Sequence, residues 1–403
     1  MKNRDILRHT KFVLCCALFA FICVCGSAAA FADSDENVPA LMDRNGLALS
    51  FENFMYYNSA RDAFSNYLDS GSSIKLTIDT ALQTQAEAIL SEALEDYEAA
   101  AGCAALLDIK TGEPLLLVST DRKLDPINSV FAPEQLFYPA TALAALNYGI
   151  VDADTAIPCE GVFTRYEDEG IAPECWIWDA APGQNLSHPE ENVTTALRDS
   201  CQYYFYCLGN DLGIDALANY ARSLGLGETG GIELPASAGV LAQRGTLPEG
   251  SQWRIGDTLE AAVGRSTNTF TAFQFARYCA AIANNGIGCS SSVIYEITDI
   301  NGNIQSREAE VVDLTSTMDE KNWAAVKGGM YLKTNDALNI NANPQTELGW
   351  EMPGMSSYED NCGLFMGYAP YDEPLYAIAV AVTDISSVSP VQQAAYDIMS
   401  LLI

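Results

Sequence analysis

The stretch from Ile74 to Thr120 constrains the fold more than any other part of the chain. It begins with the alternating segment IKLTI, which predicts a strand. Apolar residues from Leu82 to Leu94 then recur at helical spacing, after Thr80 and Gln83 in the spacing of a capping box. Two apolar segments follow, CAALLDI and PLLLVST, separated by the turn sequence KTGE. A strand, a helix and a β-hairpin are therefore predicted.

The middle of the chain, about 139–290, has mainly helical patterns. A loop rich in proline, cysteine and tryptophan interrupts it from Ile157 to Ser187. Strand-like patterns return in GLFMGYAP and LYAIAVAVTDI, and a final helix is predicted from Pro390. Two sheet-forming regions thus flank a helical insertion.

The N-terminus reads as an export segment. Basic residues at positions 2, 4, 8 and 11 precede 21 uncharged residues, Phe12 to Ala32. This length can span a bilayer, but Ala30-Phe31-Ala32 also has the form of a signal peptidase site, so an anchor and a cleaved signal both stay open for residues 1–32. The basic flank places the rest outside the cytoplasm in either case. Residues 33–73 are expected to form a short membrane-proximal linker, and residues 74–403 the main domain.

Composition narrows the possible partners. Hydrophobic residues make up 49% of the 403, as in folded globular proteins. The chain has 53 acidic against 21 basic residues, a net charge of −32. This charge disfavours nucleic acids and anionic lipid surfaces as partners.

The cysteines and histidines give little support to a metal site. Of the 12 cysteines, four lie in the apolar N-terminal run, and the others show no CxxC spacing. Cys159 and Cys175, in the loop-like region, are the candidate disulfide pair. The remaining cysteines read as buried thiols, and neither a metal nor a cofactor is expected. His188 is the only histidine outside the N-terminal segment, and a loop-ordering hydrogen bond is predicted for it.

A series of stretches, in one order and spacing, carries a resemblance to a known family. They are LTIDTALQTQAEAIL, LLDIKTGEPLLLVS, YPATALAALNYGI, LSHPEENVTTALRDSCQYYFYCLG, GLGETGGIELPASAGVL, GDTLEAAVGRSTNTFTAFQFARYCAAIANNG and LFMGYAP. Together they resemble the transpeptidase domain of penicillin-binding proteins, in particular class B. The resemblance implies an α+β fold of the β-lactamase/transpeptidase-like type. Its antiparallel sheet would have about five strands, from residues 74–120 and 345–395, flanked by helices beside an all-helical lobe.

The family carries a nucleophilic serine with a lysine one helical turn later, a Ser-x-Asn motif and a Lys-Thr-Gly motif. A serine hydroxyl needs a neighbouring base, and the i, i+3 spacing on a helix supplies it. Here the nucleophile position falls on Gln135 and the lysine position on Tyr138. An amide cannot form an acyl-enzyme ester, and a tyrosine with a pKa of about 10 is a poor base at neutral pH. The first motif is therefore lost.

The other two motifs have also changed. Ser-x-Asn falls on Ser200-Cys201-Gln202, and Lys-Thr-Gly falls on Met352-Pro353-Gly354. The proline removes a hydroxyl and a strand N–H. The resemblance implies a cleft between the sheet and the helical lobe. The residues expected to line it are Gln135, Tyr138, Ser200, Gln202, Pro353, Gly354, Met355 and Ser356.

Three literal matches to the family motifs are interpreted as structural. Ser72-Ser73-Ile74-Lys75 enters a strand and not a helix, and Lys110-Thr111-Gly112 forms the hairpin turn. Ser266-Thr267-Asn268 is expected to shape the cleft wall or to cap a helix. Trp176 and Trp178 either line a groove or pack beneath the long loop.

Three functions remain open. The first is a catalytically inactive, exported domain of peptidoglycan synthesis that binds a wall stem peptide or a membrane glycan polymerase as a scaffold. The second is an active D,D-transpeptidase with a non-standard nucleophile, sought among Ser200, Cys201, Ser356 and Ser357. The third is a β-lactam sensor, which also needs an acylable serine. Covalent labelling by a penicillin separates the first from the other two.

Overall fold

The computed structural model describes residues 39–403, except 182, 314–317 and 336–348. Residues from Pro39 to Ile403 form one compact unit. The predicted export segment, residues 1–32, lies outside the described residues. Within the described part of the chain, no helix has the length and apolar character needed to cross a membrane.

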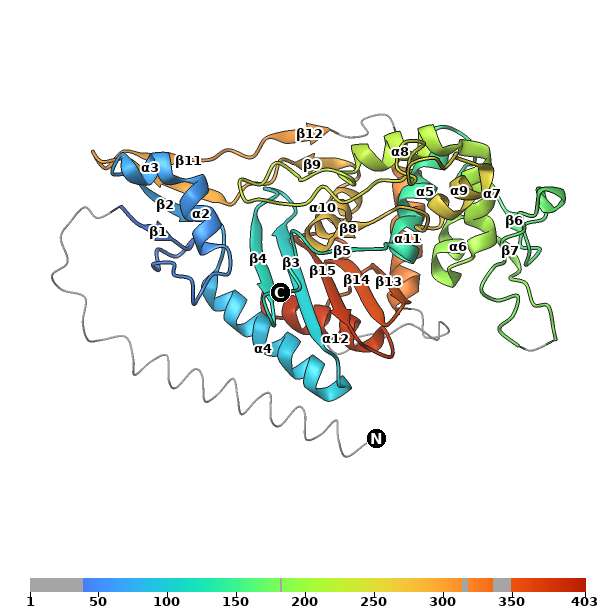
Figure 1. The fold of residues 1–403 in the computed structure, drawn as a ribbon, viewed down its shortest axis with the longest axis horizontal. Helices are drawn as coiled ribbons and strands as arrows, with labels where there is room; N and C mark the ends of the chain where they lie inside the picture. The colour runs from blue at the N-terminus through green and yellow to red at the C-terminus, as the bar shows by residue number, and fades with distance from the viewer. Residues whose placement is uncertain (1–38, 182, 314–317, 336–348) are drawn as a thin grey trace. The chain divides into compact units, whose positions relative to one another are not determined.

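A five-stranded antiparallel sheet forms the centre of the fold, in the order β13-β14-β15-β3-β4 (Figure 1). The early hairpin supplies β3 (Ala101–Asp108) and β4 (Pro114–Ser119). The C-terminal region supplies β13 (Gly354–Glu359), β14 (Cys362–Ala369) and β15 (Tyr376–Thr383). The two regions join where β15 pairs with β3 in antiparallel register. The predicted sheet of about five strands is confirmed.

Both faces of this sheet are buried, because side chains of a strand alternate between its faces. Ala104, Leu106 and Val380 belong to the core with α4 (Thr80–Tyr97) and α12 (Ser389–Met399). Ala105, Ala379 and Ala381 point to the opposite face, against α10 (Ala272–Ala283). Small side chains on that face let α10 pack close to the strands. The sheet is therefore a rigid base for the elements beside it.

Helix α4 begins at Thr80, but its cap differs from the predicted one. The side chain of Asp79 accepts hydrogen bonds from the N–H groups of Ala81 and Leu82. Gln83 instead accepts the N–H of Leu117 with its side-chain oxygen, at 2.8 Å. The Thr80 hydroxyl donates to Asp43 at 2.7 Å. The capping-box prediction for Thr80 and Gln83 was therefore wrong, since both side chains bind other partners.

The residues before the main sheet are packed onto the unit. Strand β1 (Leu41–Met42) pairs with β2 (Ser73–Leu76), which continues to β10 (Ile294–Thr298) and β11 (Ile304–Ser306). Between β1 and β2 lie α2 (Tyr57–Ala63) and α3 (Ser65–Asp69). Phe54 and Phe64 are buried in the main core. The described part of the expected linker, 39–73, thus shares the core of the domain.

The helical lobe holds the elements that position the candidate site. Helix η1 (Glu134–Phe137) leads into α5 (Tyr138–Asn147), and α11 (Glu320–Asn335) packs on α6 (Val193–Asp199). The other lobe helices are η2 (Glu167–Glu169), α7 (Gln202–Leu212), α8 (Ile214–Ser223) and α9 (Ile255–Ala262). Short strand pairs are β5 (Val130–Phe131) with β8 (Phe270–Thr271), β6 (Ile157–Pro158) with β7 (Glu190–Glu191), and β9 (Ile287–Cys289) with β12 (Val311–Asp313).

The three literal motif matches have structural roles. Ser72–Lys75 leads into β2, where Lys75 pairs with Glu296 at 3.0 Å. Lys110-Thr111-Gly112 forms the β3–β4 turn, and Asp108 accepts the first two N–H groups. Asn268 links Ala242 and Ala261 through its side-chain amide.

Candidate functional site

The first two motif positions meet in the structure. Gln135 lies in η1, directly before α5, and Ser200 ends α6. The hydroxyl of Ser200 donates a hydrogen bond to the side-chain oxygen of Gln135 at 2.8 Å. The amide at the nucleophile position is therefore a hydrogen-bond partner of the second motif.

The short helix η1 is fixed by its first residue. Glu134 has a φ of 47°, in the left-handed region, and its N–H donates to the carbonyl of Gly264. Its carboxylate pairs with Arg265 at 2.8 Å. A Cβ at Gly264 would lie 2.1 Å from the Glu134 carbonyl oxygen, so only glycine fits there. These contacts determine where the next residue, Gln135, is placed.

A lysine that the sequence analysis did not select completes the cluster. Lys333 lies in the last turn of α11, and its Nζ donates a hydrogen bond to the Ser200 hydroxyl at 2.7 Å. Both side chains are buried, each with 3% exposure. The signal was present in the sequence, because Trp323, Val326 and Met330 form a buried helical face that continues to Lys333.

Burial changes the acid–base properties of this lysine. Removal from water disfavours the ammonium form and lowers the pKa of Lys333 to about 8, although the charge of Asp199 opposes the shift. Burial raises the pKa of Asp199, but the hydrogen bond and charge of Arg198 outweigh it and hold that pKa below its ordinary value. A neutral amine is therefore accessible beside Ser200 near neutral pH.

The backbone of Ser200 is also unusual. It has φ 55° and ψ 43°, the left-handed conformation, and forms the C-cap of α6. A non-glycine residue held there costs on the order of 1–3 kcal/mol and persists only where the surroundings enforce it. Here the Ser200 side chain is held by Gln135 and Lys333.

Tyr138 does not replace the family lysine. Its ring lies 4.2 Å from that of Phe205, and the residue is 1% exposed. Burial raises the pKa of its hydroxyl well above the ordinary value, so proton abstraction at neutral pH is excluded. Tyr138 fills space in the core of the lobe.

The residues at the third motif position, Met352-Pro353-Gly354, are buried by their neighbours. Met352 is buried, and its carbonyl accepts the hydroxyl of Thr334 at 2.9 Å. A Cβ at Gly354 would lie 2.5 Å from the Met366 carbonyl. Pro353, Met355 and Ser356 are buried as well. They lie beside η1, but the structure does not expose them as open cleft walls.

Gln202 and the tryptophans order the long loop. The Gln202 side-chain oxygen accepts the N–H of Trp176 at 2.7 Å, and the Trp176 indole donates to the Asp199 carbonyl. Trp178 packs beneath the loop, since a Cβ at Gly161 would lie 2.1 Å from its ring. Gln202, expected in the cleft, thus holds the loop against α6 and α7.

Four side chains from this region form a candidate metal centre. The donor atoms of Cys159, Cys175, His188 and Cys201 all lie within 4.8 Å of one another, and all four residues are buried. Hydrogen bonds from the other thiols hold the pKa of Cys159 well below its ordinary value. Three thiolates and one imidazole are a common ligand set of structural zinc sites. The residues therefore fit a zinc ion.

This cluster bears on two expectations. Cys159 and Cys175 are free thiols in the structure and not a disulfide, because they share their surroundings with two further donors. A metal site was not expected because no CxxC spacing was visible; the fold instead gathers ligands from a 43-residue span of loop and helix ends. Cys201 lies between Ser200 and Gln202, so the cluster also anchors the second motif.

The sheet, its covering helices and the three motif positions define a transpeptidase-type domain. The family model for the penicillin binding protein transpeptidase domain matches residues 102–400, and the chain belongs to this family, in its class B form. The peptidoglycan D,D-transpeptidase MrdA of Acinetobacter baumannii is 25% identical, over 84% of this chain and 57% of the relative. The chain spans about half the length of the curated relatives that it matches.

Solved structures give the same fold. Penicillin-binding protein 2 of Pseudomonas aeruginosa in complex with WCK 5153 has a TM-score of 0.71 and 20% identity, covering 91% of this chain and 96% of that one. A chain of a peptidoglycan synthase complex has a TM-score of 0.68 and 23% identity, covering 82% of this chain and 62% of that one.

Proposed function

We propose that this chain is an exported domain of peptidoglycan synthesis that recognises its partner without forming an acyl-enzyme at the family position. The observation that carries the proposal is the hydrogen bond between Gln135 and Ser200. An amide occupies the place of the attacking hydroxyl, and it already has a partner there. With Tyr138 buried against Phe205, neither nucleophile nor base remains at the start of α5.

The partner classes follow from the relatives. MrdA relatives are named peptidoglycan D,D-transpeptidases, and one solved neighbour belongs to a complex that coordinates polymerization and crosslinking. We infer that this domain acts in the bacterial cell envelope, where it binds a membrane glycan polymerase or a stem peptide. The N-terminal export segment supports this location, and it would hold an uncleaved chain at the membrane.

Fluorescent penicillin labelling tests the absence of acylation. The purified chain is expected to remain unlabelled at saturating drug, while an active class B protein treated in parallel becomes labelled. A covalent label that survives denaturation would contradict the proposal. For the binding role, the chain is used as bait with solubilised membranes and is titrated calorimetrically with a D-alanyl-D-alanine stem peptide. If neither the polymerase nor the peptide binds, the scaffold function is wrong.

A second function is favoured by one observation, the bond between Lys333 and Ser200. A neutral Lys333 amine can accept the Ser200 proton while Oγ attacks a carbonyl, as in serine–lysine acyl transfer. The ester forms as the leaving amine departs, and that amine takes the proton from Lys333. A penicillin label on the peptide containing Ser200, lost in Ser200→Ala, would establish this function or that of a β-lactam sensor. The first proposal predicts that no such peptide is found.

A further inference from the structure

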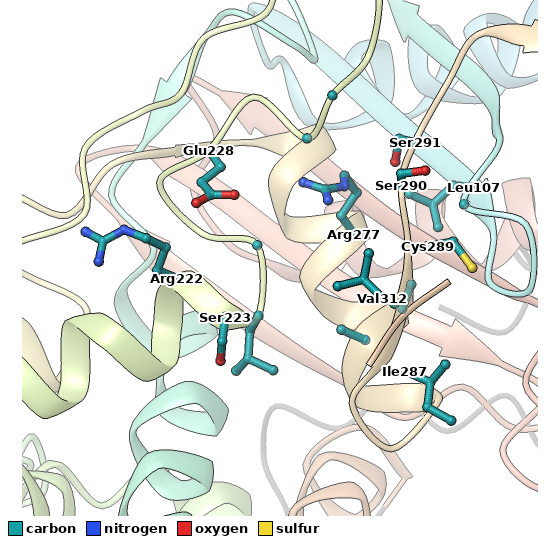
Figure 2. Close-up of a pocket in the computed structure, with 18 of the residues that line it drawn as sticks. Leu107, Arg222, Ser223, Glu228, Arg277, Ile287, Cys289, Ser290, Ser291 and Val312 are labelled. Atoms are coloured by element: carbon teal, nitrogen blue, oxygen red, sulfur yellow. The ribbon is translucent and has the colours of Figure 1, made fainter. Parts of the chain in front are cut away.

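A cavity of about 570 Å³ lies away from the candidate site, between the end of α8, helix α10 and strand β9 (Figure 2). Its apolar lining includes Leu107, Ala281, Ile287 and Val312. Its volume is in the range of small-molecule sites, which combine an apolar lining with a few polar groups.

An arginine without a hydrogen-bond partner lines this cavity. Among the residues that the structure describes, Arg277 forms no hydrogen bond and no ion pair, and its Nη1 is fully shielded from solvent. A Cβ at Gly230 would lie 2.5 Å from Nη1, so the loop after α8 packs directly on the guanidinium. Burial lowers the pKa of Arg277, which indicates that the charge lacks full compensation. A guanidinium in this state favours a carboxylate ligand.

An acidic group faces this arginine. Figure 2 shows the Glu228 carboxylate and the Arg277 guanidinium turned toward each other, while Arg222 extends away from both. The charge of Glu228 acts on Arg277, but the two side chains do not form an ion pair. Glu228 is exposed at the rim, whereas Arg277 lies deeper. The cavity therefore presents a cationic guanidinium and an anionic carboxylate that do not form an ion pair with each other.

A second polar atom in the lining lacks a partner. Ser291 is 1% exposed, and its hydroxyl has no hydrogen bond among the described residues. The neighbouring Ser290 hydroxyl, in contrast, accepts a bond from Arg307 at 2.8 Å. Buried polar groups are nearly always hydrogen-bonded. Because Nη1 of Arg277 and the Ser291 hydroxyl are both packed against protein, a ligand in the cavity contacts Arg277 through its other guanidinium atoms.

We propose that this cavity binds a free α-amino acid with an apolar side chain. The ligand carboxylate binds Arg277, its ammonium group binds Glu228, and its side chain lies on the apolar lining. A simple carboxylate would be repelled by Glu228, and a simple amine would leave Arg277 unmet. A ligand that carries both charges, as an α-amino acid does, satisfies both residues. The site is independent of the function proposed above.

Calorimetric titration of the purified full chain tests this site with three compounds of similar shape. Leucine, in either enantiomer, carries both charges; 4-methylpentanoate lacks the ammonium group, and 3-methylbutylamine lacks the carboxylate. Leucine is expected to bind about tenfold or more tightly than either analogue, because each loses one charged contact. Equal binding of the three compounds, or no heat with leucine at millimolar concentration, would overturn the proposal.

Two variants assign the contacts. Arg277→Met should abolish the preference for leucine over 3-methylbutylamine, and Glu228→Gln the preference over 4-methylpentanoate. Arg165→Met removes an exposed arginine that pairs with Asp211, and should leave leucine binding unchanged. Unchanged leucine affinity in Arg277→Met would refute the carboxylate contact. If Arg277→Met does not fold, the affinities of the three compounds for the wild type and for Glu228→Gln still test the proposed binding of the amino acid.

Discussion

The amine of Lys333 donates a hydrogen bond to the hydroxyl of Ser200 at 2.7 Å, although 133 positions separate the two residues in the chain. The same hydroxyl donates to Gln135. An amine therefore reaches Ser200 from α11, while the resemblance aligns the two lysine positions of the family with Tyr138 and Met352. This relationship gives the first two predictions.

Replacement of Lys333 by methionine should change the pH dependence of stability. The folded-state pKa of Lys333 is about 8, below its ordinary value of 10.5. Between these values the unfolded chain holds a proton that the folded chain lacks, so wild-type stability rises with pH relative to Lys333→Met. The difference in the free energy of unfolding between the wild type and Lys333→Met should change by roughly 3 kcal/mol from pH 7 to 11. Urea unfolding at several pH values measures this difference. The same pH dependence of the free energy of unfolding in both proteins would contradict a buried amine that titrates.

Removal of the Ser200 hydroxyl should destabilise the domain through Lys333. Ser200→Ala leaves the buried amine without this acceptor, at a cost of about 1–3 kcal/mol. In Lys333→Met the same substitution should cost less, because no buried amine then needs the hydroxyl. Chemical unfolding of both single variants and the double variant gives the coupling energy. Additive effects would mean that the hydrogen bond contributes nothing to stability.

The contact between α11 and α6 should depend on one of two adjacent glycines. A Cβ at Gly329 would lie 2.7 Å from the Leu197 Cβ, whereas at Gly328 the nearest atom is 3.9 Å away. Gly329→Ala should therefore cost about 1–3 kcal/mol through overpacking. Gly328→Ala, the matched control, should stabilise by about 0.5–1 kcal/mol because alanine favours the helix. Thermal unfolding of the two variants distinguishes these outcomes, and equal shifts would refute the packing argument.

The cysteine and histidine cluster should carry one zinc ion per chain. Elemental analysis of protein purified without chelator measures it. Cys175→Ser should lose the metal, and Cys362→Ser, which changes a cysteine outside the cluster, should retain it. A ligand present at about a thousand times its Kd adds about 4 kcal/mol, so chelation should lower the unfolding midpoint. Full metal content in Cys175→Ser would show that zinc binds elsewhere.

The sequence predicted the sheet because CAALLDI and LYAIAVAVTDI are short continuous apolar runs, which are typical of strands buried on both faces. It also placed Gln135 and Ser200 in one site through the resemblance. Lys333 was not predicted as a site residue, because a charged residue on a helix is ordinarily expected to be exposed to solvent. Only the continuation of the buried helical face beyond Met330 indicated its burial. The candidate metal ligands were not predicted, because separate loop and helix ends bring them together at spacings that match no short motif.

Cys201 is part of the candidate metal cluster and also of the second motif, Ser200-Cys201-Gln202. Its sulfur is part of the metal-type cluster, and its peptide bonds hold Ser200 on one side and Gln202 on the other. Oxidation or metal exchange at that sulfur would therefore take place next to the residue that Lys333 binds. The state of this sulfur and the position of the Ser200 hydroxyl are thus linked through a single peptide bond.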